Sequence, residues 1–396
     1  MAHSRAAVHR AVNLGALSGV LFILAGCCGA GVSPSSPRPG SPPVPHRGEV
    51  IETSTGRVMD MDGLAARLAR DEVIYVGETH TSVEDHEVQL EILRKLARDR
   101  RYVQLAMEMF PANARPVLDR YIDGRMSEQD FLKEVKWNEV WGFPYALYKG
   151  LIDFQKQRGM PVIGLNAPYR VVRKIGQHGL GSLTPRERSR VARVFHREDR
   201  SNRERVKKDF MAHGRYEIKD FESFFEAQLA WEETMAQTLA RRLDQTRSPI
   251  VVVLGKGHIS KRFGVPHLTL LRRPETTLGT VVPVPSDYPA SAIGPDLADY
   301  VVITGKSEPS RHPRLGVIIE PAKPGPGVRI AGVLPGTAAD AAHLHKADII
   351  LAVNGAAVKE VEDVQRAVAK SGPACTLLIE RNNVRLRVEV SIPPDR

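Results

Sequence analysis

Four short apolar segments of this sequence end in polar residues whose side chains could do chemistry. These residues are Glu78 and His80 after segment 73–76, Glu108 after 102–107, Asn166 after 161–165 and His258 after 250–254. Two carboxylates and two imidazoles could bind a divalent metal such as zinc or manganese. A carboxylate–histidine pair could also serve as a general base. The sequence contains no nucleophile elbow, no P-loop and no Gly-x-Gly-x-x-Gly motif after the first segment, so neither serine hydrolysis nor nucleotide binding is favoured.

The four apolar segments have the pattern of strands buried on both faces of a parallel sheet. They are continuous apolar runs, and helical stretches at about 83–99, 127–159 and 184–245 separate them. This order predicts an α/β fold, a layered and mostly parallel sheet flanked by long helices. Since the carboxyl ends of parallel strands meet at one edge, we expect the five polar residues to share one site.

The amino terminus has the pattern of a bacterial lipoprotein signal. Arg5 and Arg10 precede an apolar stretch that is too short to span a bilayer comfortably, and the stretch ends in Leu24-Ala25-Gly26-Cys27. This ending resembles a lipobox, which predicts cleavage of residues 1–26 and lipidation of Cys27. Residues 27–49 are rich in Pro, Ser and Gly and predict a disordered tether. The expected location is the bacterial cell envelope, at the outer membrane or the periplasmic face.

Composition limits the remaining classes of protein. The chain has 396 residues with 26% charged and 42% hydrophobic residues, which excludes a disordered chain and a polytopic membrane protein. Three cysteines exclude a disulfide framework, and Cys375 is expected to be a buried apolar side chain. The net charge is +10, and the segment 173–219 carries a net +8. This basic segment is either a solvated helical face or a cationic cover for an anionic ligand or lipid headgroups. A lipid-anchored chain outside the cytoplasm is not expected to bind nucleic acid.

A longer series of motifs resembles the ChaN-type haem-binding lipoproteins, which belong with the Tiki proteases, PrgY/TraB proteins and erythromycin esterases. The order and spacing match across about 50–275. The motifs are Gly77-Glu78-Thr79-His80, His86, Gln89, Ile92-Leu93, Glu108-Met109-Phe110, Trp137, Trp141-Gly142, Tyr148, Asn166-Ala167-Pro168, Gly179-Leu180, Ala227-Gln228, Met235-Ala236, Gly257-His258 and Gly264-Val265-Pro266. One departure is Glu232, which stands where the family usually has aspartate.

The resemblance implies non-covalent haem binding for haem or iron uptake, with Glu78, His80, Asn166 and His258 near the cofactor. A homodimer that holds haem between its subunits is also compatible with it. The family's iron ligand is a tyrosine, and Tyr216 in the basic segment is the first candidate, with Tyr148 and Tyr169 as alternatives. Phenolate suits ferric iron because it is a hard anionic oxygen. The superfamily's enzymes imply a competing function, a metal-dependent hydrolase that uses Glu78, His80, Glu108 and His258, with His80 and His258 as metal ligands.

The carboxyl-terminal part resembles a bacterial-type PDZ domain over 312–393. The resemblance rests on Leu315-Gly316-Val317, Gly336-Thr337, Asp348-Ile349-Ile350-Leu351, Asn354-Gly355, a helix near 361–370 and a hairpin turning at Asn382-Asn383. Ala347 stands where a glycine is usual. The resemblance implies a small α+β domain that binds a peptide or a protein carboxyl terminus, with Leu315, Gly316 and Val317 holding the carboxylate.

The sequence therefore predicts a ligand domain at 50–282, a Pro-rich linker at 283–311 and a PDZ domain at 312–393. Haem binding is the leading function, the hydrolase is the second, and a pure adaptor acting through the PDZ domain is the third. The intact set of polar residues after the four strands argues against a first domain without function.

Overall fold

The computed structural model describes residues 46–98, 102–197, 200–212, 220–259, 264–306, 315–322, 325–333 and 337–392. The predicted signal peptide, lipidated Cys27, nearly all of the tether and Tyr216 lie outside the described residues. The described part forms two domains, each built on its own sheet. Among these residues, none of the helices combines the length and the apolar character needed to cross a bilayer.

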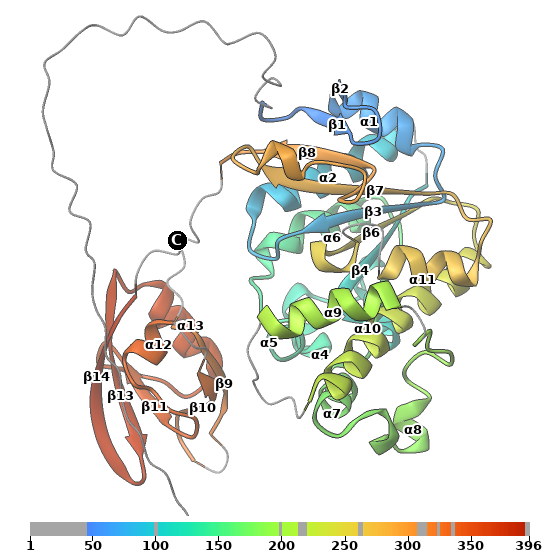
Figure 1. Cartoon of the computed structure of the whole chain (residues 1–396). Helices are drawn as coiled ribbons and strands as arrows, with labels where there is room; N and C mark the ends of the chain where they lie inside the picture. The colour runs from blue at the N-terminus through green and yellow to red at the C-terminus, as the bar shows by residue number, and fades with distance from the viewer. Residues whose placement is uncertain are drawn as a thin grey trace, which may run out of the picture. The chain divides into compact units, whose positions relative to one another are not determined.

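The first domain is built on an eight-stranded sheet in the order β2-β1-β8-β7-β3-β6-β4-β5 (Figure 1). The strands are β1 Val50–Glu52, β2 Arg57–Met59, β3 Val73–Glu78, β4 Gln104–Pro111, β5 Val162–Asn166, β6 Ile250–Gly255, β7 Leu278–Pro285 and β8 Tyr300–Thr304. Pairing is parallel from β8 through β7, β3, β6 and β4 to β5, and the β1–β2 hairpin adds to β8 in antiparallel fashion. The mostly parallel α/β sheet is thus confirmed, and the four predicted strands are β3, β4, β5 and β6.

Helices cover both faces of this sheet, as the continuous apolar strands predicted. They are α1 Met61–Leu68, α2 Val83–Leu96, α3 Arg115–Ile122, α4 Glu128–Val135, α5 Trp137–Val140, α6 Ala146–Gln157, α7 Tyr169–His178, α8 Pro185–Arg188, α9 Arg200–Ala212, α10 Phe221–Leu243 and α11 Val265–Arg272. Alternate residues of each strand enter two separate cores. Ile74 and Val76 pack with α1, α2 and α6, whereas Val73 and Tyr75 pack with α10 and α11.

The stretch at 184–245 is not one continuous helix. It is divided into α8, α9 and α10, and caps define two of the starts. The Thr184 side chain accepts from Glu187 N while Glu187 accepts from Thr184 N, and Asp220 accepts from Ser223 N at the start of α10. These bonds satisfy amide groups that the first helical turn leaves free.

The predicted linker at 283–311 is wrong for most of its length. Residues up to Pro285 complete β7, and Tyr300–Thr304 forms β8, so both belong to the first domain's sheet. The prolines misled the prediction because proline is rare in a central strand. Here β7 pairs with β3 only from Leu278 to Val281. Pro283 and Pro285 lie beyond that pairing, where β7 pairs with β8 on its other side only.

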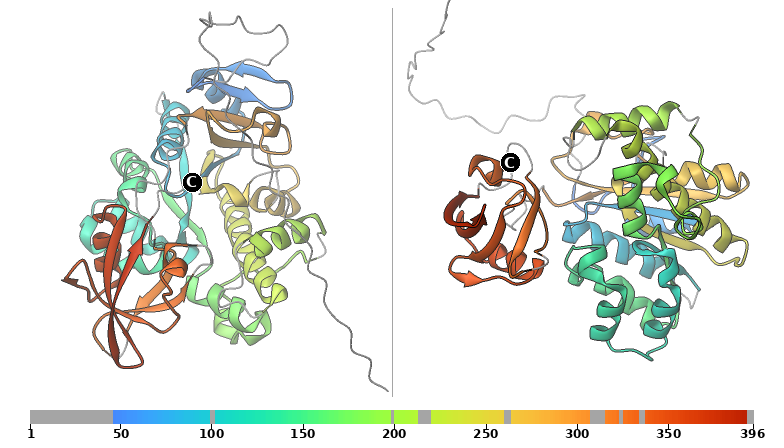
Figure 2. Two further views of the ribbon diagram at one scale, coloured as in Figure 1. Left: turned by 60° about the vertical axis from the view of Figure 1, so that its left-hand side comes forward. Right: turned by 90° about the horizontal axis from the view of Figure 1, so that it is seen from below.

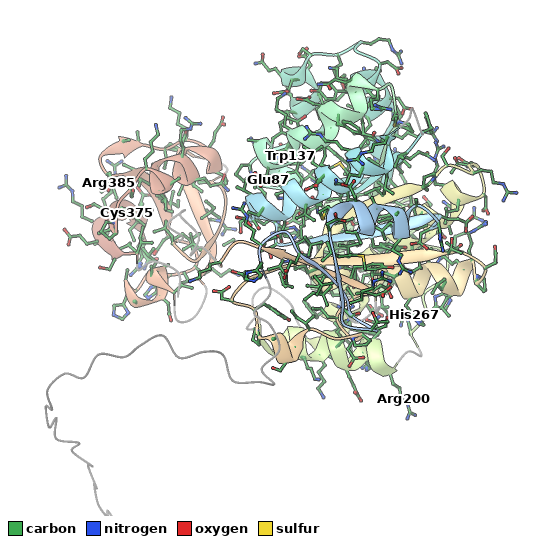
Figure 3. The ribbon with its side chains drawn as sticks, turned by 90° about the horizontal axis from the view of Figure 1, so that it is seen from above. Glu87, Trp137, Arg200, His267, Cys375 and Arg385 are labelled. Atoms are coloured by element: carbon green, nitrogen blue, oxygen red, sulfur yellow. The ribbon has the colours of Figure 1, made fainter. Side chains whose placement is uncertain are left out.

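The second domain is a small α+β unit, orange to red in Figure 2, with the strand order β14-β13-β11-β10-β9 and β12 beside β11. Its elements are β9 Val317–Pro321, β10 Val328–Val333, α12 Ala338–Ala341, β11 Ile349–Val353, β12 Ala356–Ala357, α13 Val361–Ala369, β13 Ala374–Arg381 and β14 Val384–Ser391. The predicted helix is α13, and Asn382 and Asn383 turn the last hairpin with φ of 51° and 64°. Cys375 lies inside the domain, as predicted, whereas Arg385 lies on its outside (Figure 3).

Candidate functional site

The carboxyl edge of the main sheet brings together the five polar residues that were predicted to follow the central strands. Glu78 ends β3, Glu108 lies in β4, Asn166 ends β5, and His258 lies in the 3₁₀ turn after β6. Asn166 Nδ2 donates to the Glu108 carbonyl oxygen at 3.0 Å. We call this group, with His80, the strand-end site.

Glu78 is the centre of a buried hydrogen-bonded cluster. Its Oε1 accepts from Tyr148 OH at 2.8 Å and lies 2.8 Å from His80 Nδ1. Its Oε2 accepts from Gln89 Nε2 at 2.9 Å and lies 3.3 Å from His86 Nδ1. The Glu78 side chain is fully buried, so these partners replace the water that an ionised carboxylate requires.

These contacts determine which nitrogen of His80 donates to Glu78 and how the ring is held. A carboxylate can only accept, so the Nδ1 of His80 carries the proton that binds Glu78. In the uncharged ring, Nε2 then holds a lone pair. The ring packs against Trp141 and Phe143, with centroid distances of 4.8 and 4.9 Å, and the side chain remains 31% exposed. His80 is therefore a fixed and partly exposed histidine whose Nδ1 is bonded to Glu78 and whose remaining nitrogen is Nε2.

His258 is held in a different state, between two buried carboxylates. Its Nδ1 lies 2.9 Å from Glu232 Oε1, and its Nε2 lies 3.3 Å from Glu108 Oε1. Burial by itself lowers the pKa of His258, but the charges and hydrogen bonds of Glu108 and Glu232 outweigh burial and raise the pKa to about 10. His258, whose side chain is 17% exposed, is accordingly an imidazolium at neutral pH, not a free base.

The pKa values of the two carboxylates that bind His258, Glu108 and Glu232, are shifted in the opposite direction. Burial by itself raises the pKa of Glu108, but His258, the charge of His80 and the Gly255 N–H, at 2.8 Å from Glu108 Oε2, hold it below its ordinary value. Burial also acts to raise the pKa of Glu232, yet Arg205 and His258 lower it. Both carboxylates are therefore charged at neutral pH, which keeps His258 protonated.

Arg205 ties helix α9 to this charged group. Its guanidinium donates to Glu232 Oε1 at 2.7 Å, to Asn202 Oδ1 at 2.8 Å and to the Gly257 carbonyl oxygen at 2.9 Å. The side chain is only 17% exposed. Part of the basic segment is thus docked against the strand-end site by a buried ion pair, and the rest of α9 exposes Lys207 and Lys208.

Gly255 allows the His80 ring to lie close to strand β6 and to Glu108. A Cβ atom at this position would lie 2.9 Å from His80 Cε1, 3.2 Å from His80 Nε2 and 3.7 Å from Glu108 Oε2. The ring of His80 therefore rests directly on the backbone of β6, which requires a residue without a side chain.

The tyrosine candidates for the haem-iron ligand differ in how well they suit that role. Tyr148 is fully buried and donates to Glu78, and burial followed by the Glu78 charge raises its pKa far above the ordinary value. It is unsuited to be an iron-bound phenolate. Tyr169 begins α7 just after β5 and is 46% exposed. Tyr216 lies outside the described residues.

Sequence reasoning did not identify every member of this site. Arg205, Asp85 and Lys256 were missed as contributors, although Lys256 Nζ lies 2.8 Å from Asp85 Oδ2 and the same oxygen accepts from Thr79 N at 2.7 Å. One usable signal was the Ser82-x-x-Asp85 spacing at the start of a helix, where Ser82 caps α2. Arg205 offered no such signal among its many basic neighbours.

A metal centre is not preformed in the described ranges. No group of three or more His, Cys, Asp or Glu side chains there is arranged to hold an ion. Glu78 and His80 bind each other, while Glu108 and Glu232 both bind His258. His80 Nε2 is nevertheless the type of donor that a metal or a haem iron accepts, and its carboxylate partner is the usual support for such a ligand.

Comparisons with known proteins agree with this fold. ChaN of Campylobacter jejuni, whose structure is described as showing cofacial haem binding, aligns with 64% of this chain and 95% of its own, at 17% identity and a TM-score of 0.51. This similarity concerns the fold. RETICULATA-RELATED 5, a chloroplastic protein of Arabidopsis thaliana, is 26% identical over 134 residues, which are 31% of this chain and only 17% of that protein. The PDZ domain of HtrA3, bound to a phage-derived ligand, covers 20% of this chain at 22% identity, and its TM-score of 0.19 carries no argument.

Two family models match the chain. Residues 305–380 match the PDZ domain, and this match begins directly after β8. Residues 64–268, just over half of the chain, match the model described as haem-binding uptake, Tiki superfamily, ChaN, and they contain the whole strand-end site. The protein therefore belongs to the ChaN family of haem-binding proteins and carries a PDZ domain after its ChaN domain.

Proposed function

We propose that this chain is a cell-envelope lipoprotein that binds haem non-covalently in haem or iron uptake, and that its PDZ domain recruits a protein partner. Membership of the ChaN family carries the proposal. The lipobox at Cys27 supports the anchor and the location at the outer membrane or periplasmic face. A homodimer with haem between its subunits is part of the same proposal.

The described residues fit an anionic iron porphyrin. His80 is partly exposed and packs against the aromatic rings of Trp141 and Phe143, which could lie against a flat ligand. The exposed Lys207 and Lys208 of α9 supply positive charge for propionates on the helix that Arg205 docks at the site. Bound haem supplies a Lewis-acidic ferric iron, and Tyr216 remains our proposed phenolate ligand.

The buried groups would position the accessible ones. Glu78 holds the proton on His80 Nδ1, so its ring keeps Nε2 directed away from the carboxylate. His258, Glu232 and Arg205 hold α9 against the edge of the sheet. These residues would thus orient the donors of the site without contacting iron themselves.

Haemin titration of a chain that begins at residue 29 tests the proposal. We expect saturable binding with a high-spin ferric spectrum and a charge-transfer band, as phenolate ligation gives. Tyr216→Phe should weaken or alter this spectrum, and His312→Ala between the domains should leave it unchanged. Only weak, unsaturable uptake of haemin would contradict haem binding.

A second candidate, a metal-dependent hydrolase, rests on one observation. His80 is bonded to a buried carboxylate, as metal-bound or general-base histidines often are. Elemental analysis of the same preparation separates the two functions. Stoichiometric zinc or manganese that is lost in His80→Ala and His258→Ala would favour the hydrolase.

A further inference from the structure

The connection between the two domains begins at the same edge of the sheet as the strand-end site. Strand β8 is parallel to β7, which is parallel to β3, so the end of β8 at Thr304 lies at the carboxyl edge. The next residue, Gly305, donates its N–H to the Glu84 carboxylate. Glu84 also binds Arg47 at 3.1 Å.

Glu84 lies close to the site itself. It stands in the first turn of α2, next to Asp85, whose carboxylate binds Thr79 N and Lys256. Thr79 directly precedes His80. A Cβ atom on Gly305 would lie 2.6 Å from Glu84 Oε1, so the chain is held tightly there. The connection therefore leaves the first domain from a fixed point beside the loop that carries His80.

The other end of the connection enters the peptide-binding end of the PDZ domain. Leu315 is 5% exposed in the PDZ core, and its carbonyl oxygen accepts from Ala339 N at 2.8 Å. Gly316 has a φ of 78°, and a side chain there would overlap Thr337. Leu315-Gly316-Val317 is the segment expected to hold a peptide carboxylate. The first described residues after the connection are thus the segment expected to bind the carboxylate.

The loop opens onto an edge that a peptide can extend. In the described part of this sheet β9 pairs only with β10, which leaves its other edge open for strand addition. Val317 and Ile319 of β9 pack in one apolar cluster with Val361 and Val364 of α13. A partner with an apolar carboxyl-terminal segment fits this edge.

The length of the connection limits how far a bound carboxylate can lie from the site. Nine residues, 306–314, separate Gly305 from Leu315. Fully extended, this stretch spans at most about 35 Å, whatever the orientation of the two domains. A partner held within this distance has an effective concentration on the order of millimolar. A partner present at roughly 10 μM would then be enriched about 100-fold near the strand-end site.

We propose that the protein captured by the PDZ domain is the one that exchanges haem with the strand-end site. The partner would have a free, apolar carboxyl terminus and would carry or accept haem. This inference rests on the proposed haem-binding function. A PDZ domain that only anchored the protein to a partner would not need this short connection. The connection joins the carboxyl edge of the main sheet to the segment expected to bind the peptide carboxylate.

Haemin transfer to apomyoglobin tests the exchange. The acceptor carries a carboxyl-terminal extension selected from a phage library on the chain that begins at residue 29, and failure to select any peptide overturns the proposal. We expect faster transfer to the extended acceptor, and excess free peptide should abolish the gain. Inserting 50 Gly/Ser residues between 306 and 315 should reduce the gain about 17-fold, because effective concentration falls as roughly the −3/2 power of tether length. The same 50 residues added after residue 396 should change nothing.

A readout without haem separates this inference from the proposed function. Cys375 is buried, so Val83→Cys, at a 57% exposed position beside Glu84, provides an accessible thiol for a dye in the chain that begins at residue 29. Energy transfer to a dye on the bound peptide should be strong and should fall with the 50-residue insertion. Strong energy transfer without haemin binding would refute only the haem function. A transfer rate that depends on neither the extension nor the tether length overturns the exchange proposal.

Discussion

Replacing Gly255 by alanine should disturb the strand-end site more than any change of that size elsewhere in its loop. The added Cβ would lie 2.9 Å from His80 Cε1, closer than the 3.0 Å that real Cβ atoms essentially respect. The His80 ring cannot swing aside freely, since Glu78 holds Nδ1 and Trp141 and Phe143 pack on the ring. The φ of Gly255 is −59°, which alanine adopts readily, so the effect would come from this contact.

The expected cost is that of overpacking a well-packed site, roughly 1–3 kcal/mol. For a domain of this size each kcal/mol lowers Tm by about 2–4 °C, so Gly255→Ala should lower it by roughly 2–12 °C. The displaced His80 should also weaken haemin binding. Thermal unfolding by circular dichroism and the NMR signals of the His80 ring would measure both effects.

Gly257→Ala is the matched control, because a Cβ at that position meets no atom within 4 Å. It lies two residues away in the same turn and should leave stability and the His80 signals nearly unchanged. If Gly255→Ala is as stable as Gly257→Ala and its His80 signals do not move, the close approach of His80 to β6 is refuted.

Three further predictions concern other parts of the chain. Ala347 has a φ of 75°, so Ala347→Gly should stabilise the PDZ domain by about 1 kcal/mol in urea unfolding, and a loss of stability would contradict that backbone conformation. The pKa of His258 is raised to about 10, so its stabilising contribution is complete below its ordinary pKa of about 6.5 and is lost as pH rises through 10. The stability advantage over His258→Gln should therefore shrink between pH 7 and 10, and an advantage that stays constant over this range would refute the imidazolium. In a bacterial host, Cys27→Ala should release the protein from the membrane fraction, and undiminished membrane binding would show that the lipobox is not used.

The sequence also predicted one boundary wrongly. The prolines at 283 and 285 made this stretch look like a linker, because a single sequence does not show where the pairing of β7 with β3 ends. The first domain ends at β8 instead. The segment that leads to the PDZ domain therefore starts at the edge of the sheet that carries the strand-end site. Pro283 and Pro285 stand where β7 still pairs with β8 but no longer with β3, which is a property of the assembled sheet.

By itself the sequence determined the four central strands, the edge at which their polar residues meet and the presence of a PDZ domain. These follow from local patterns, since apolar runs and turn residues act within a few positions along the chain. Only the tertiary structure decided the roles of the two histidines. His80 contacts Glu78, which is close to it in the sequence, whereas His258 contacts Glu108 and Glu232 from distant segments. Arg205 of α9 also binds Glu232. The charge state of a histidine depends on burial and on partners brought from distant segments, so the carboxylates of Glu108 and Glu232 make His258 a cation.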